Sequence, residues 1–365
     1  MKKLSLLLAL TIFNSGLSWA GVSVDGASLT HAQVADYTGS GITITSPVDY
    51  QTIQRSGTTA NITISGTYSG SPTAIEARFN GGSWATIVAS PAGGTFTGTL
   101  SSQNQGQGVL EVRYTNDTAT TDDINFFGIG DVYLCAGQSN MSGRGTSNQS
   151  YSHASLRASL YGNNNAWKNL VDPYDSATNQ VDTVSSDTSP AAAGSWIPLL
   201  ATGIMADRSV PVAFIPCAKG GTSSTEWQPG ADHQDRTTLY GSCVYRANQA
   251  GGVKAVLWWQ GESDAASAVS QATYNANLDT IANAFNTDLG VKLVAVILQN
   301  STGVTDLDEQ KIRDATAEAI LDNANVLQGP DFSDISSDDT FHLKTNGNLQ
   351  TAADRWLTAL NSAGV

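Results

Sequence analysis

Residues 131–141 read DVYLCAGQSNM, and this stretch decides the fold class of the chain. Its first part is mostly apolar, which is typical of a strand that is buried on both faces of a sheet. Gly137 then permits a sharp turn, because glycine has no Cβ. Ser139 follows the turn, so we expect its hydroxyl at the end of the strand, where a nucleophile would stand.

Similar apolar runs alternate with helix-like segments through residues 128–365. This alternation predicts an α/β domain, a doubly wound and mostly parallel sheet with helices on both faces. We expect strands at 131–137, 210–217, 253–259, 291–298 and near 326–327, and helices at 195–208, 239–249, 265–288, 306–323 and 345–363. Residues 144–194 are rich in Ser, Asn, Asp and Tyr, and we expect a long surface excursion there, near the site.

Residues 21–127 have a different pattern, in which short alternating runs are separated by turn-forming residues. This pattern predicts a small β-sandwich domain that precedes the α/β domain. The expected strands lie at 42–45, 60–66, 74–79, 94–100 and 109–114. This region carries no catalytic motif, so it is interpreted either as a structural spacer or as a sugar-binding module.

The N-terminal residues predict export. A basic start, an apolar run at 4–13 and a small-residue site at 18–20 follow one another in the order of a signal peptide. We therefore expect residues 1–20 to be removed and the mature protein to be secreted or periplasmic. No later apolar stretch approaches the roughly 20 residues of a membrane helix.

Charge and cysteine content exclude some classes of ligand. The net charge of −14, from 18 basic and 32 acidic residues, argues against a nucleic-acid partner. Cys135, Cys217 and Cys243 are an odd number of thiols, which we interpret as small buried hydrophobic residues, with a Cys217–Cys243 disulfide as the alternative. No Cys/His cluster has the spacing of a zinc site, and we predict neither a metal nor another cofactor.

Polar groups follow three of the predicted strands. Ser139 follows the first. Gly220 and Gly221 follow the second, and their backbone N–H groups could face a developing oxyanion. Gln260 follows the third and could donate its amide to the same oxyanion, while Glu262 could orient a histidine. The carboxyl ends of such strands meet at one edge of the sheet, where the ligand site is expected.

A candidate base lies near the end of the chain. Asp339 comes three residues before His342, so its carboxylate can reach the imidazole within one helical turn and stabilise the imidazolium. His31 lies in the β-rich region, and His153 and His233 lie in polar loops without this context. We therefore assign the role of base to His342.

This combination of motifs resembles the SGNH-hydrolase superfamily and, within it, the sialate O-acetylesterase group, which is close to carbohydrate esterase family 6. The resemblance covers roughly residues 128–363 and omits the β-rich region. The matching segments are 137–141, 220–222 with Trp227, 259–264, and Asp339 with His342. It implies a flavodoxin-like three-layer sandwich in which Ser139 is acylated and His342 is the base. It also implies an oxyanion hole formed by the N–H of Ser139, a glycine N–H at 220 or 221, and the side chain of Gln260.

The resemblance leaves the orienting carboxylate open between Asp339 and Glu262, and we favour Asp339 because it fits the Asp-x-x-His pattern. Three further residues are candidates for substrate binding. Gln138 adjoins the nucleophile, Arg144 could bind a sialate carboxylate, and Trp227 could stack on a sugar ring.

The sequence thus predicts a secreted serine esterase that hydrolyses O-acetyl groups of a carbohydrate, as sialate O-acetylesterases do. An acetyl xylan esterase or another SGNH esterase or lipase is the alternative within enzymes. The alternative from another class is a non-catalytic carbohydrate-binding protein. The expected partner is an O-acetylated sugar or glycan, and the sequence gives no oligomeric state.

Overall fold

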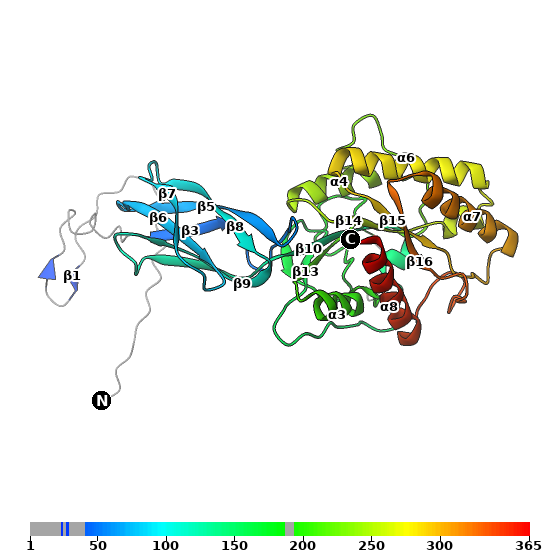
Figure 1. Ribbon diagram of the computed structural model, residues 1–365, viewed down its shortest axis with the longest axis horizontal. Helices are drawn as coiled ribbons and strands as arrows, with labels where there is room; N and C mark the ends of the chain where they lie inside the picture. The colour runs from blue at the N-terminus through cyan, green and yellow to red at the C-terminus, as the bar shows by residue number, and fades with distance from the viewer. Residues whose placement is uncertain (1–22, 25–26, 29–40, 187–192) are drawn as a thin grey trace.

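The computed structural model describes residues 23–24, 27–28, 41–186 and 193–365. The predicted signal peptide at 1–20 lies outside these residues. Most of the described chain falls into two parts (Figure 1), which we name the β lobe (residues 41–127) and the α/β region (residues 128–365). Two very short strands, β1 (Ser23–Val24) and β2 (Ala27–Ser28), precede the β lobe and pair with each other.

A parallel sheet forms the centre of the α/β region. Its strands are β13 (Val212–Pro216), β10 (Thr121–Gly137), β14 (Ala255–Trp259), β15 (Leu293–Ile297) and β16 (Val326–Asp331), in that spatial order. Five strands were expected in this region, and each overlaps one of these. The mixed α/β architecture with a large central sheet is therefore confirmed.

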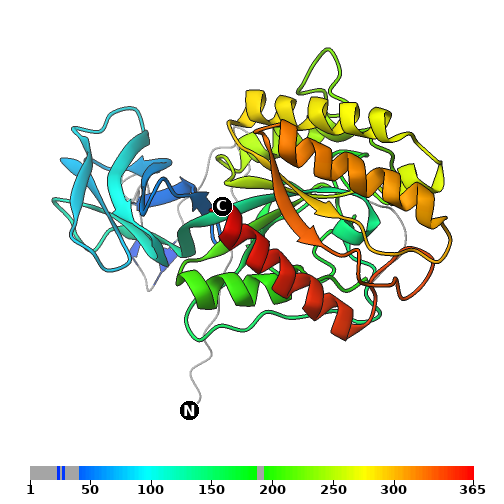
Figure 2. The same cartoon turned by 45° about the vertical axis from the view of Figure 1, so that its right-hand side comes forward.

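Long helices cover both faces of this sheet (Figures 1 and 2). On one face lie α4 (Leu239–Gln249), α6 (Gln271–Leu289) and α7 (Asp306–Asp322), and on the other lie α3 (Ile197–Arg208) and α8 (Asn346–Ala363). Four of these helices, α4, α6, α7 and α8, follow a Ser or Thr whose hydroxyl accepts a backbone N–H of the first turn. Such N-caps satisfy N–H groups that have no partner within the helix, which fixes where each helix begins.

One predicted helix is wrong in its extent. The segment expected as a single helix at 265–288 forms two, α5 (Glu262–Ala266) and α6. Ala268 has a left-handed backbone with φ 52°, which ends the first helix. The side chain of Ser270 then accepts the N–H of Thr273 at 3.1 Å and begins the second. The break leaves α5 as a short helix close to the end of β14.

The excursion at 144–194 contains two strands that the sequence analysis missed. β11 (Ser159–Tyr161) pairs parallel with β13, and β12 (Trp167–Asn169) pairs antiparallel with β11. They extend the sheet at its β13 edge. Each has only three residues, which is too short for an alternating pattern to be recognised.

The β lobe is built from antiparallel strands. β3 (Gly41–Ser46), β5 (Thr59–Ser69) and β8 (Thr95–Asn104) form one sheet, while β6 (Ala74–Phe79), β7 (Ala85–Ala89) and β9 (Gly106–Tyr114) lead to the first half of β10. The short strand β4 (Thr52–Gln54) runs parallel to β10. Buried side chains of these strands form a hydrophobic core separate from that of the α/β region. Each of the five expected strands overlaps an observed one, whereas β4 and β7 were not expected.

Strand β10 belongs to both parts, and a buried charge lies on it. Asp131 is fully buried and pairs with Arg55 at 2.7 Å, Arg208 at 3.0 Å and Lys254 at 3.2 Å. Burial raises the pKa of Asp131, but hydrogen bonds from Arg55 and the charge of Lys254 outweigh it and hold this pKa below its ordinary value. Since Arg55 follows β4 while the other two cations lie in the α/β region, Asp131 ties the two parts together.

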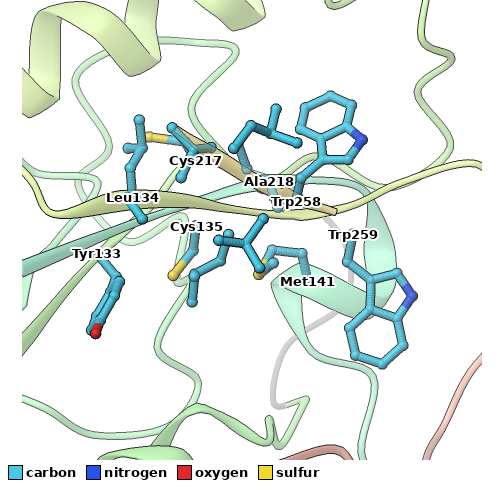
Figure 3. Close-up of a cluster of buried hydrophobic side chains, with 14 of the residues drawn as sticks. Tyr133, Leu134, Cys135, Met141, Cys217, Ala218, Trp258 and Trp259 are labelled. Carbon is cyan, nitrogen blue, oxygen red and sulfur yellow. The ribbon is translucent and has the colours of Figure 1, made fainter. Parts of the chain in front are cut away.

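The core of the α/β region packs against both faces of the sheet (Figure 3). Trp258 and Trp259 are neighbours on β14 whose side chains point to opposite faces. Trp258 meets Trp227 edge-on at 5.2 Å, and the ring of Trp259 stacks on Phe332 at 4.5 Å. The three cysteines are free and buried, as we favoured over a disulfide. Such packing leaves polar groups few positions except the ends of the strands.

Two further observations hold for the described part of the chain. None of its helices combines the length and the apolar character needed to cross a membrane. It also holds no group of three or more His, Cys, Asp or Glu side chains arranged to bind a metal ion.

Candidate active site

Ser139 begins the short helix α2 (Ser139–Ser142) at the carboxyl end of β10. The turn before it requires glycine. Gly137 has φ 130°, and a Cβ at this position would lie 2.1 Å from the backbone oxygen of Trp259. The chain can therefore pass close to β14 and turn, which brings the Ser139 hydroxyl to the edge of the sheet.

The Ser139 hydroxyl lies beside His342, which is 203 positions later in the chain. His342 Nε2 is 2.9 Å from Ser139 Oγ, and His342 Nδ1 is 3.1 Å from each carboxylate oxygen of Asp339. Asp339 also accepts the backbone N–H groups of Phe341 and His342. Although burial raises the pKa of Asp339, these hydrogen bonds outweigh it and hold the pKa well below its usual range. The carboxylate is thus ionised at neutral pH, which favours a proton on Nδ1 and leaves Nε2 as an acceptor for the Ser139 proton.

Glu262 has different partners. It is 2% exposed, and it accepts the side-chain amides of Asn140 at 2.6 Å and Gln299 at 3.2 Å. Both amides also donate to the backbone oxygen of Phe341, at 3.0 and 2.8 Å. Burial raises the pKa of Glu262. Its carboxylate therefore braces the loop that carries His342, whereas Asp339 contacts the imidazole itself.

Sequence reasoning missed Asn140 and Gln299. Asn140 also accepts the backbone N–H of Leu343 at 3.1 Å, so its amide holds the residues on either side of His342. A signal for Gln299 was present, because it is the first polar residue after the fourth parallel strand. The rule that identified the other strand ends would have found it.

The structure differs from our expectation for Gln260. Its side chain is 1% exposed, and its amide nitrogen donates to Asp264 at 2.5 Å and to the backbone oxygen of Thr222 at 3.1 Å. A carboxylate is the stronger acceptor, and Asp264 on α5 holds this amide away from the space beside Ser139. Gln260 is therefore part of the support beneath the site.

Gln138 occupies the position that we expected Gln260 to fill. Its side-chain oxygen accepts the N–H groups of Ser263 at 3.1 Å and Gly261 at 3.4 Å, and the amide of Gln260 at 3.3 Å. Because all three partners are donors, they fix which end of the amide is oxygen. Gln138 also lines the hollow at Ser139, so its amide nitrogen is the end left to face this space.

A hollow of about 530 Å³ opens beside Ser139. It is lined by Gln138, Ser139, Arg144, Gly220, Gly221, Glu262, Ser263, Ala266, Ser267, Phe341 and His342. Gly221 has a left-handed backbone with φ 75°, and a Cβ added there would have no atom within 4 Å. The structure thus gathers six of the predicted residues with Gly220 around one space, and Asp339 supports it through the imidazole.

Trp227 is not part of this lining, contrary to our expectation. It is fully buried against Trp258, and its indole N–H donates to the hydroxyl of Thr222 at 3.0 Å. That hydroxyl in turn donates to the backbone oxygen of Lys219 at 2.7 Å. Trp227 therefore cannot stack on a sugar and instead holds the loop that contains the two glycines.

Comparison with known proteins identifies the family. The family described as carbohydrate esterase, sialic acid-specific acetylesterase matches residues 129–357, which is more than half of the chain. The chain belongs to this carbohydrate esterase family. The matched residues contain every residue named above for the site, from Gln138 to His342.

Individual relatives of the esterase are distant. A probable carbohydrate esterase from Arabidopsis thaliana is 29% identical over 149 residues, which are 39% of this chain and 53% of the relative. The chain thus spans about half the length of that curated relative. A crystal structure of a carbohydrate acetylesterase from Xanthomonas citri has a TM-score of 0.57 and 20% identity, covering 86% of this chain and 73% of the other. A solved Arabidopsis thaliana protein has a TM-score of 0.48 and 23% identity, covering 64% of this chain and 98% of the other.

Proposed function

We propose that this protein is an exported serine esterase that removes acetyl groups from hydroxyls of a carbohydrate. The observation that carries the proposal is the 2.9 Å contact between Ser139 Oγ and His342 Nε2 at the edge of a hollow. Membership in a carbohydrate esterase family supports the class of substrate. Export rests on the signal-like residues 1–20, and residues 21–127 are proposed to be an accessory β-sandwich domain.

The reaction follows from the positions of the donors and acceptors. His342 Nε2 takes the Ser139 proton while Oγ forms a bond to the acetyl carbonyl carbon. The bond to the sugar oxygen then breaks, and that oxygen receives the proton from His342. A water molecule next attacks the acetyl-serine with His342 again as base, releasing acetate and restoring the serine hydroxyl. Asp339 stabilises the imidazolium in both steps.

The negative oxygen of each tetrahedral intermediate needs donors. We assign these to the backbone N–H of Ser139, a backbone N–H at Gly220 or Gly221, and the amide nitrogen of Gln138. Gln138 takes the place of Gln260 in this proposal, because three donors hold its oxygen away from the hollow. Donors that are fixed before the reaction stabilise developing charge without reorganisation.

Replacing the nucleophile tests the mechanism. We expect Ser139→Ala to lower kcat on p-nitrophenyl acetate by at least about 10³-fold. Ser142→Ala is the matched control, since this buried serine lies on the same helix and its hydroxyl has no hydrogen-bond partner in the described structure. The control should keep wild-type activity. Retention of most activity by Ser139→Ala would refute the proposed nucleophile, and labelling of Ser139 by a fluorophosphonate would exclude a non-catalytic protein.

The sugar is to be identified by direct comparison. We propose an O-acetylated sialic acid, because the Arg144 side chain lines the hollow and can bind the sialate carboxylate. Arg144→Ala should then lower kcat/KM for O-acetyl sialic acid about tenfold while leaving that for acetylated xylan unchanged. Faster acetate release from the xylan, with no effect of Arg144→Ala on either substrate, would favour an acetyl xylan esterase.

A further inference from the structure

A second hollow lies along the excursion, and the esterase mechanism does not use it. Its volume is about 500 Å³, and it runs along residues 149–157 and 169–172. Tyr151, His153, Arg157 and Asn169 bring a phenol, an imidazole, a guanidinium and an amide to its wall. No residue lines both this hollow and the one beside Ser139. The second hollow therefore presents several hydrogen-bonding groups around an aromatic ring, away from the reacting atoms.

An exposed aromatic pair borders this hollow. The rings of Tyr50 and Phe126 stack with centroids 4.9 Å apart, and Phe126 is 39% exposed. The guanidinium carbon of Arg157 is 5.9 Å from the centre of the Phe126 ring, so Arg157 belongs to both features. Val171, which lines the hollow, is also exposed. Exposed apolar groups gathered in this way indicate a binding surface.

The aromatic pair is held in an unusual backbone conformation. Tyr50 has φ 62° and Phe126 has φ 56°, in a left-handed region that bulky residues rarely adopt. Gln107 enforces it in part, because its amide donates to the backbone oxygens of Phe126 at 3.2 Å and Arg157 at 3.0 Å, and its oxygen accepts the Arg157 N–H at 2.6 Å. Strained residues of this kind concentrate at functional sites.

The polar groups of the hollow keep donors for a ligand. His153 Nδ1 accepts the backbone N–H groups of Ser155 and Leu156, so the proton of the neutral ring is on Nε2. The Arg157 side chain donates to the backbone oxygen of Leu156, and within the described residues it forms no ion pair. Both side chains can therefore donate to hydroxyl or carboxylate oxygens.

We propose that the second hollow and the Tyr50–Phe126 pair together bind a glycan chain, so that the enzyme acts on esters of an oligo- or polysaccharide. Sugar rings present C–H faces that pack on aromatic rings and hydroxyls that accept from His153 and Arg157. Arg144 of the first hollow and Gln149 of the second are five positions apart, which limits their separation to about 18 Å. A glycan held at the second hollow would raise the effective concentration of its esters at Ser139. This role rests on the proposed function, but the binding itself does not.

Phe126→Asn is the decisive variant, because asparagine tolerates the left-handed backbone better than phenylalanine does. A merely structural Phe126 would lose stability on this change, whereas a binding residue should lose affinity with the thermal midpoint unchanged or higher. Arg157→Ala is a second variant with little risk to folding. Leu321→Gln is the matched control, since Leu321 is an exposed apolar residue on α7.

Affinity gel electrophoresis of the full chain, with acetylated xylan in one gel and polysialic acid in another, measures the binding. We expect wild type and Leu321→Gln to be retarded in at least one gel, and Phe126→Asn and Arg157→Ala to bind about fivefold more weakly there. On the same polysaccharide kcat/KM should fall about fivefold, with p-nitrophenyl acetate hydrolysis unchanged. Wild-type migration unaffected by both polysaccharides, or retardation that both variants retain, would overturn the proposal. Failure of the wild type to cleave any ester would refute the proposed function but would leave the gel result to decide the glycan surface.

Discussion

Residues 121–126 of β10 and residues 127–137 of the same strand follow different rules of burial. The first stretch lies in the antiparallel β lobe, where buried Ile124 stands among exposed and half-buried neighbours. The second stretch is buried throughout and runs through the parallel sheet, which helices cover on both faces. The change takes place at a bulge between Ile124 and Phe127.

The comparison explains where chemistry can lie in each region. In the β lobe, polar side chains can face water anywhere along a strand, so they do not gather at one place. In the α/β region a polar side chain can reach water only where a strand ends. Ser139, Gly220 and Glu262 therefore meet at one rim although the sequence separates them widely. The next four predictions move from this rim through the shared strand to the β lobe.

The largest effect is expected at the two carboxylates near the rim. Asp339→Asn should lower kcat about 10³-fold, because the amide no longer stabilises the imidazolium or selects the proton position on Nδ1. Glu262→Gln should cost about tenfold or less, since Glu262 supports the loop only through Asn140 and Gln299. Kinetics on p-nitrophenyl acetate measure both. Equal losses would show that the two carboxylates share one role.

A smaller loss is expected from the amide that faces the hollow. Gln138→Glu keeps an oxygen for the N–H groups of Gly261 and Ser263 but replaces the proposed oxyanion donor. We expect kcat to fall about 10²-fold with KM and the thermal midpoint nearly unchanged. A large drop in the midpoint together with normal kcat would instead assign Gln138 a purely structural role.

At the shared strand, we expect an effect on stability and none on chemistry. Asp131→Asn should lower the free energy of unfolding by about 2 kcal/mol at pH 7, because three cations lose their buried counter-charge. The folded pKa of Asp131 is depressed, so its contribution is complete above the unfolded pKa near 4 and is lost as pH falls through the folded pKa. Denaturant titrations of both proteins at several pH values should show the difference shrinking in acid. A difference that persists there would contradict this account.

The smallest effect is expected in the β lobe. Gly57 has φ 61° with no atom within 4 Å of an added Cβ, so Gly57→Ala introduces backbone strain without a clash. The free energy of unfolding should fall by about 1 kcal/mol with esterase activity unchanged. Urea denaturation and a p-nitrophenyl acetate assay would check this. Lost activity would mean that strain in the β lobe reaches the rim.

The sequence predicted most of the fold because its patterns are local. The apolar run at 131–136 and the helix at 239–249 follow from residues a few positions apart. The alternation of strands and helices then restricts the topology. The three-residue strands β11 and β12 and the break between α5 and α6 depend on tertiary packing and single backbone angles, which no periodic pattern carries.

For the site, the sequence predicted proximity better than orientation. The contact expected between Ser139 and His342 is present, as is the contact between His342 and Asp339. Two glutamines follow neighbouring strand ends, and nothing local tells which amide faces the hollow. That choice depends on Asp264, which captures the Gln260 amide and thereby leaves Gln138 at the surface of the hollow.

The continuity of β10 has a practical consequence for dissecting the protein. The sequence suggested a division between residues 127 and 128, but this peptide bond lies inside an unbroken strand. A fragment starting at residue 128 would lack Arg55 and would uncover backbone that pairs with β4 and β9. Truncation at this point would therefore expose a sticky strand edge, and catalysis is better separated from the N-terminal part by point substitutions than by scission.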